Sequence, residues 1–178
     1  MSAGFYGKLP SRGDFIGGGL ASFVVDALDQ WMRACLVASQ AALGSAWIDC
    51  WMEAPVWRFF SVIGTTRFGG VWMPSMDKVE RCFPLVIAIE AEQAGPGWFD
   101  AAEAAGFDAV TGAAMGEMTP DHLALRLRAI APDAWTPPAA GVWWTAGAPR
   151  REAGQVACEG LPDPAIFAGF LSDRGTAP

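Results

Sequence analysis

The sequence is poor in the residues that carry most enzyme and metal chemistry. Its 178 residues include one histidine, one tyrosine and four cysteines. The cysteines are widely separated and form no Cys-x-x-Cys pair, so their spacing predicts no zinc site and no other metal or cofactor. We expect all four to be free thiols buried in the fold: Cys35, Cys50, Cys82 and Cys158.

Long apolar runs and clustered positive charge are also missing. No window reaches the roughly 18 unbroken apolar residues of a membrane span, and the first residues lack the charged and apolar regions of a signal peptide. The net charge of −7 argues against a nucleic-acid partner and against docking on anionic lipid, because both need clustered Lys and Arg. These absences predict a soluble cytoplasmic protein without membrane insertion.

What the chain has in abundance is apolar and aromatic residues. Apolar residues make up 52% of the chain and charged residues 17%, which is enough for a sizeable core in one domain over residues 1–178. Large rings fill cores or form exposed partner surfaces. The sequence leaves open which role applies to Trp47, Trp51, Trp98, Trp143 and Trp144.

Hydrophobic periodicity and turn residues predict the order of the elements. A first strand at Phe5 and Tyr6 leads into a turn, and residues 17–19, all glycine, are expected to form a flexible joint. Ser22 is the expected N-cap of a long helix over 23–43, with Phe23 at the start of its core-facing stripe. Thr119 is the expected N-cap of a later helix with Pro120 in its first position.

The other expected elements alternate between helices and strands. They are a short helix 47–53, strands 56–63, 68–73 and 85–90, a helix 98–115 anchored by Phe99, Ala102 and Phe107, strands 141–145 and 154–158, and a helix 164–171. Residues 132–140 read as a Pro-rich connector and 172–178 as a frayed tail. The pattern predicts an α/β fold, a three-layer α-β-α sandwich around a mixed, largely antiparallel sheet.

Polar residues stand out in two places within otherwise apolar or Gly/Pro-rich sequence. One is the first turn, and the other is the loop 74–84 between two expected strands, where binding groups are commonly held. If the two meet at one end of the sheet, they form a mixed-charge cluster. Its candidate binding residues are Lys8, Arg12, Asp14, Ser75, Asp77 and Arg81, with Arg58 in a similar setting.

This cluster has two interpretations. In the functional one, Lys8, Arg12 and Arg81 form an anion site for a phosphorylated or acidic partner. In the structural one, Arg12 or Arg81 pairs with Asp14 or Asp77 and fixes the two turns. Both remain open at the level of sequence.

Recognised catalytic motifs are absent. Gly7-Lys8 lacks the spacing of a phosphate loop, and the glycine triplet lacks the dinucleotide fingerprint. A hydrolase with Ser75 as nucleophile would need a general base. The lone His122 falls on an expected surface helix, and Lys8 is the remaining candidate. We therefore predict no catalytic residue and a protein that is not an enzyme.

Several motifs taken together resemble the TagF (ImpM) family of type VI secretion-associated proteins. The opening run 4–15, GFYGKLPSRGDF, is similar to the family's signature. Further similar positions are Trp31, the run 54–59, Gly70-Val71, Met73-Pro74-Ser75, Asp77, Val79, Arg81, Phe83-Pro84-Leu85 and Trp143-Trp144. Two positions depart from the pattern: Glu80 stands where the family usually has glycine, and Cys82 where a bulkier or aromatic residue is common.

The resemblance carries functional implications that composition and spacing do not. It implies a cytoplasmic accessory protein of the type VI secretion system that regulates secretion negatively and post-translationally through protein–protein binding. It also implies a forkhead-associated scaffold protein of that system as partner. A structural subunit of the secretion apparatus and a hydrolase using the Ser75 loop are the alternative readings.

Overall fold

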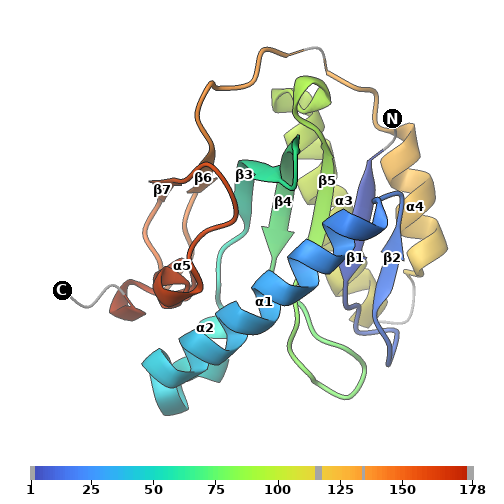
Figure 1. Cartoon of the computed structure of the whole chain (residues 1–178). Helices are drawn as coiled ribbons and strands as arrows, with labels where there is room; N and C mark the ends of the chain where they lie inside the picture. Colours follow the sequence, from blue (N-terminus) through green and yellow to red (C-terminus); the bar gives the residue numbers. More distant parts are fainter. Residues whose placement is uncertain (1–2, 115–117, 134, 176–178) are drawn as a thin grey trace.

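A seven-stranded sheet runs through the part of the chain that the computed structural model describes, residues 3–114, 118–133 and 135–175. Its strands are β1 (Gly4–Gly7), β2 (Ile16–Gly18), β3 (Trp57–Ile63), β4 (Thr66–Met73), β5 (Leu85–Glu90), β6 (Val142–Thr145) and β7 (Gly154–Ala157). The order across the sheet is β2-β1-β5-β4-β3-β6-β7. Figure 1 shows β1 and β2 at one edge and β6 and β7 at the other.

Each pairing among the described strands is antiparallel. The α/β class is confirmed, because the chain combines this sheet with several helices. The expected sheet was mixed, but no parallel pair is found among the described strands. The reason lies in the connections. Four of the six pairings join strands that are consecutive in the sequence, and such neighbours pair antiparallel because a parallel pair needs a long crossover. The two pairings between distant strands, β1 with β5 and β3 with β6, are antiparallel as well.

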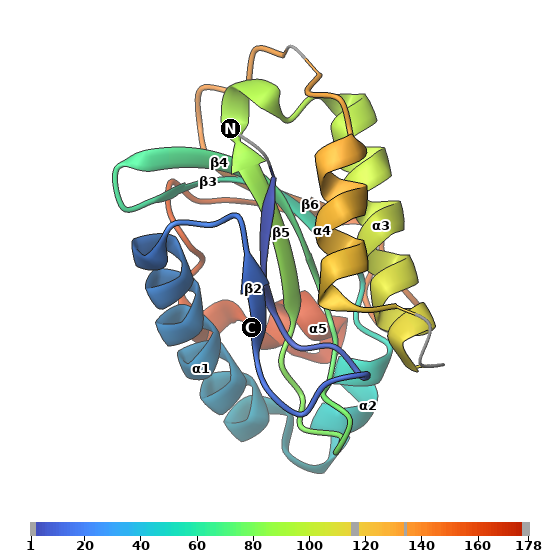
Figure 2. The same cartoon turned by 90° about the vertical axis from the view of Figure 1, so that its right-hand side faces the viewer.

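Five α-helices and four short 3₁₀ turns accompany the sheet in the described residues. The helices are α1 (Ser22–Leu43), α2 (Trp47–Met52), α3 (Pro96–Ala114), α4 (Pro120–Ala129) and α5 (Ala168–Leu171). The 3₁₀ turns are Gly44–Ala46, Ala91–Gln93, Pro164–Ile166 and Asp173–Gly175. In Figures 1 and 2, α1, α2 and α5 lie on one face of the sheet, and α3 and α4 lie on the other.

The core consists of two clusters of buried side chains, one on each face of the sheet. Neighbouring strand residues alternate between them, as the pleat requires: Phe59 and Trp72 belong to the cluster shared with α1, α2 and α5, and Phe60 and Val71 to the cluster shared with α3 and α4. Of the five tryptophans left open by the sequence, four are buried and Trp144 is half-buried.

The start of the chain corrects two expectations. The glycines at 17–19 are not a flexible joint: Gly17 and Gly18 belong to the edge strand β2 (Ile16–Gly18), where they pair with Tyr6 and Phe5, and Gly19 follows the strand with a positive φ. A Cβ added at Gly17 or Gly18 would meet its nearest neighbours, in Phe5 and Tyr6, at 3.4–3.6 Å, which is ordinary van der Waals contact, so β2 does not depend on glycine at these two positions. Ser22 is already helical, and the N-cap is Ala21, which makes no side-chain cap bond.

Two expected core anchors are exposed. The buried stripe of α1 begins at Val24, one residue after Phe23, whose exposed fraction is 47%. Phe107 on α3 is 59% exposed, whereas Phe99 and Ala102 are buried. The Thr119 N-cap is confirmed, because its hydroxyl accepts a hydrogen bond from the His122 backbone N–H. The expected end of α3 at Met115 lies outside the described residues.

Backbone hydrogen bonds place much of the connector and tail. Asp133 N donates to Gln93 O, and Trp135 N donates to Glu92 O, so the connector is tied to the turn that precedes α3. Ser172 is buried, and Asp173 accepts a hydrogen bond from Arg151. The rest of the expected tail, 176–178, lies outside the described residues.

The four cysteines are free thiols; Cys35 and Cys50 are buried, and Cys82 and Cys158 are half-buried. Among the helices that the structure describes, none has both the length and the apolar character needed to cross a membrane.

Candidate functional site

The first turn and the loop 74–84 lie together at one end of the sheet, which is the condition under which the sequence predicts a mixed-charge cluster. Lys8 N donates to Pro84 O at 3.3 Å, and Lys78 N donates to Arg12 O at 3.0 Å. The Ser75 hydroxyl donates to Lys8 O at 2.8 Å. These three bonds join two segments that are about seventy residues apart in the sequence, so the cluster is a built part of the fold.

Asp77 is the centre of this cluster. One carboxylate oxygen, Oδ2, accepts from Lys8 Nζ at 2.9 Å and from Arg81 Nε at 2.7 Å. The other, Oδ1, accepts from the backbone N–H groups of Val79 and Arg81, both at 3.0 Å. The Asp77 side chain is fully buried, and four donors satisfy it.

This environment shifts the ionisation of Asp77. Burial by itself would raise the pKa of the carboxyl group, but the hydrogen bonds from Lys8, Arg81 and Val79 outweigh it and hold the pKa far below its ordinary value. Asp77 is therefore a buried anion whose charge fixes the loop.

Lys8 and Arg81 share this carboxylate but differ in exposure. Lys8 is buried, and its Nζ also lies 4.9 Å from the centre of the Phe15 ring. The Arg81 side chain is 63% exposed, and its Nη2 donates to Gly13 O at 2.7 Å. Of the pairs considered in the structural interpretation, Arg81–Asp77 is present, and Lys8 belongs to the internal support instead of an exposed anion site.

Arg12 and Asp14 lie outward from this support. Both side chains are exposed, and within the described residues neither makes a hydrogen bond or an ion pair. Together with Phe15 and Lys78 they line a pocket of about 380 Å³. Arg81 does not line this pocket but is tied to it, because its Nη2 donates to Gly13 O in the lining. We call the following four exposed charged residues the charged rim: Arg12, Asp14, Lys78 and Arg81.

Phe15 supports the rim in a way that sequence reasoning missed. Its ring stacks on Tyr6 with centroids 5.6 Å apart and meets Phe83 edge-on at 4.8 Å. The Tyr6 hydroxyl in turn donates to Asp29 on α1 at 2.7 Å. Burial, followed by this hydrogen bond, raises the pKa of Tyr6 well above its ordinary value. The sequence signal for these aromatic contacts was the phenylalanine at the end of a Gly/Pro-rich run.

Ser75 lies inside the cluster. It is buried, its hydroxyl is donated to Lys8 O, and its carbonyl accepts from Trp51 Nε1 at 3.0 Å and from Phe83 N at 3.1 Å. The only histidine, His122, is exposed on α4. Arg58 does not join the cluster, because it pairs with Glu103 and Asp100 of α3 at 2.7 and 2.9 Å.

The backbone conformation of the loop is unusual at Glu80, one of the two positions that depart from the pattern of the resemblance. Glu80 has a φ of 63°, and it is the non-glycine residue with a positive φ in the described part of the chain. That conformation favours glycine, the residue that the resemblance implies at this position. Here a glutamate takes it, and the turn is closed by the bonds of Asp77 to Val79 and Arg81. Among the described residues, no group of His, Cys, Asp or Glu could hold a metal ion.

Comparison with known proteins shows to which family this chain belongs. Residues 4–128 match the TagF N-terminal domain, which is type VI secretion system-associated. The fold is similar to the crystal structure of PA0076 from Pseudomonas aeruginosa PAO1, at 30% identity and a TM-score of 0.75 over 97% of this chain and 94% of that one. No curated protein matches the chain. The chain therefore belongs to the TagF family of type VI secretion-associated proteins.

Proposed function

We propose that this chain is a non-enzymatic, cytoplasmic regulator that restrains type VI secretion post-translationally by binding another protein. The family match supports the link to secretion, and the charged rim supports recognition of a protein partner. By the family resemblance, that partner is the forkhead-associated scaffold protein of the system. The charged rim is the surface that we assign to it.

The observation that carries this proposal is the way the rim is held. Arg81 is fixed from both sides, by Asp77 and by Gly13 O, while most of its side chain faces solvent. The exposed Arg12 side chain lies on the adjoining turn and, within the described residues, makes no hydrogen bond or ion pair. Guanidinium groups presented on a preorganised frame bind carboxylate or phosphate oxygens with little ordering cost. An acidic or phosphorylated segment is the chemistry that fits this surface.

The hydrolase alternative has less support. Catalysis at Ser75 would need a free hydroxyl beside a base, but the hydroxyl is buried and donated to a carbonyl. Lys8, the remaining base, is paired with Asp77 and is needed there as a cation. The alternative of a structural subunit predicts a permanent assembly, which the size of the purified protein in dilute solution tests directly.

The direct test measures binding of the purified chain to the scaffold protein of its own host by isothermal titration calorimetry. We expect Arg12→Glu and Lys78→Glu each to weaken binding about tenfold, since each places a like charge against an acidic partner. The matched control is Arg128→Glu, which makes the same charge change at an exposed position on α4, away from the rim.

The measured affinities are interpreted together with a secretion assay. Overproduced wild type should repress release of a secreted substrate, and the rim variants should lose this repression while Arg128→Glu keeps it. Unchanged affinity in both rim variants would refute the rim as the binding surface. Absence of any binding by the wild type, tested with phosphorylated and dephosphorylated scaffold, would refute the choice of partner.

A further inference from the structure

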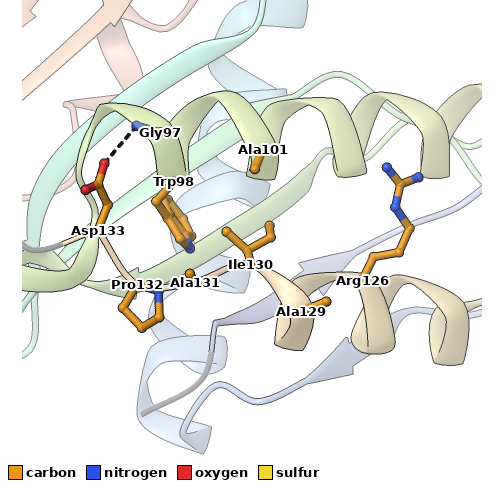
Figure 3. Close-up of a pocket in the computed structure, with 9 residues that line it drawn as sticks. All are labelled: Gly97, Trp98, Ala101, Arg126, Ala129, Ile130, Ala131, Pro132 and Asp133. Carbon is orange, nitrogen blue, oxygen red and sulfur yellow. Dashed lines mark hydrogen bonds between the residues drawn. The ribbon is translucent and has the colours of Figure 1, made fainter.

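A second site lies at the opposite end of the sheet from the charged rim, where α3 begins and α4 ends (Figures 1 and 2). A pocket of about 540 Å³ is open there between the two helices and the start of the connector. Figure 3 shows its lining: Trp98 and Ala101 on α3, and Ile130, Ala131 and Pro132 after α4. The walls are mainly apolar, and neither the rim nor its partner accounts for this pocket.

One polar group in this lining lacks a partner. Trp98 is 1% exposed, and its indole Nε1 donates to no acceptor in the described residues. In Figure 3 the ring extends from α3 with its nitrogen turned toward Ile130 and Ala131. A buried N–H without an acceptor is costly and uncommon in native proteins. Its presence in a pocket wall points to an acceptor that the protein chain does not supply.

Two backbone donors at this end of α3 already have acceptors within the chain. Gly97 N donates to Asp133 Oδ2 at 3.0 Å, and Phe99 N donates to Gly95 O at 3.1 Å. Two backbone donors of this helix start are therefore satisfied from within the chain. The indole N–H of Trp98 is the buried side-chain donor of the lining that has no acceptor in the described residues.

The charges around the pocket decide which ligand fits. The carboxylate of Asp133 lies at the indole end, where it would repel an anionic ligand. Arg126 at the other end is already paired with Asp108 at 2.6 Å. We propose that this pocket binds a small, uncharged, apolar molecule with a carbonyl oxygen that accepts the hydrogen bond of Trp98 Nε1. The apolar part of the ligand packs against Ala101, Ile130 and Pro132.

Three small probes of similar shape test this assignment: acetophenone carries the carbonyl, ethylbenzene lacks it, and benzoate adds a negative charge. Binding is followed through the indole N–H resonances in proton–nitrogen NMR spectra, with the Trp98 resonance identified by its loss in Trp98→Phe. We expect acetophenone to shift the Trp98 resonance and to bind roughly tenfold tighter than ethylbenzene or benzoate.

Two variants separate a hydrogen bond from general apolar binding. In Trp98→Phe, the affinity for acetophenone should fall to the affinity for ethylbenzene. In the matched variant Trp135→Phe, on the exposed connector, acetophenone should still bind more tightly than ethylbenzene. Ala101→Leu fills the pocket from α3 and should abolish binding of both probes even if Trp98→Phe fails to fold. The proposal is overturned if acetophenone leaves the Trp98 resonance unmoved, or if acetophenone and ethylbenzene bind the wild type equally.

Discussion

Lys8 and Asp77 form a buried ion pair across 69 residues of sequence, with Nζ and Oδ2 2.9 Å apart. The lysine follows the strand β1, and the aspartate sits in the loop between β4 and β5. β1 pairs with β5 in the sheet, so the end of one and the approach to the other meet at this pair. The four predictions below concern this junction.

Removing the carboxylate should be strongly destabilising. In Asp77→Ala, the buried Lys8 ammonium loses its counter-ion and two backbone donors lose their acceptor, so we expect a loss of about 3–5 kcal/mol in the free energy of unfolding. Lys8→Met should cost less, because Asp77 keeps Arg81 and both backbone donors. Urea unfolding followed by circular dichroism measures both.

The control for that experiment is an exposed ion pair. Arg126 and Asp108 are 2.6 Å apart, but both are well exposed, so Arg126→Gln should change the free energy of unfolding by less than about 1 kcal/mol. If Asp77→Ala were as mild as Arg126→Gln, the carboxylate would not be the support of the loop.

Stability should depend on pH through Asp77. Its pKa in the folded chain lies below the ordinary value of 3.8, so the unfolded chain takes up the proton first as the pH falls. The contribution of Asp77 is therefore complete above the unfolded value and is lost as the pH falls through the lower folded value. The difference in unfolding free energy between wild type and Asp77→Asn should be constant from pH 7 to about pH 5 and shrink below about pH 4. A difference that grew on acidification would contradict the assignment.

Glu80→Gly should stabilise the protein. The positive φ of Glu80 strains a residue with a side chain, and glycine removes this strain, although it also adds freedom to the unfolded chain. We expect a net gain of up to about 1 kcal/mol in the thermal or urea unfolding free energy. The neighbour Val79 has no positive φ, so Val79→Gly should instead destabilise. Equal effects of the two substitutions would argue against strain at Glu80.

Gly7→Ala should prevent the junction from closing. Gly7 has a φ of 147°, and an added Cβ would lie 1.9 Å from Pro84 O, so Pro84 and the loop would have to move. We expect a loss of at least about 3 kcal/mol in the free energy of unfolding. Gly44→Ala is the comparison: its φ of 53° is also positive, but nothing lies within 4 Å, so the cost should stay near 1 kcal/mol.

Local patterns predicted much of the fold because the elements have local causes. The strands β3, β4 and β5 follow from β-forming runs bounded by Gly and Pro, and the start of α4 follows from Thr119 and Pro120. The edge strand β2 was missed because two of its three residues are glycine, which has little strand propensity. It forms only because β1 offers a partner, which is a long-range effect.

The candidate site shows the same division. The two polar segments themselves could be recognised, because polar residues there interrupt apolar runs, but their meeting entered the sequence prediction only as a condition. Which cation would enter the core was not, since Lys8, Arg12 and Arg81 look alike in sequence. Their roles depend on how the backbone at Gly7 and Pro84 directs each side chain. The unpaired indole of Trp98 was equally hidden, because hydrogen-bond partners are set by tertiary packing.

The sheet order also has a consequence for biosynthesis. β6, which lies after the matched residues 4–128, pairs with β3. Two early indoles depend on still later carbonyls, because Trp31 donates to Pro162 O and Trp57 donates to Phe170 O. A nascent chain that has emerged only to residue 128 lacks β6 and both of these acceptors, as well as Trp143, Phe167 and Phe170 of the buried cluster. This cluster is therefore complete only after residues 142–171 have been synthesised.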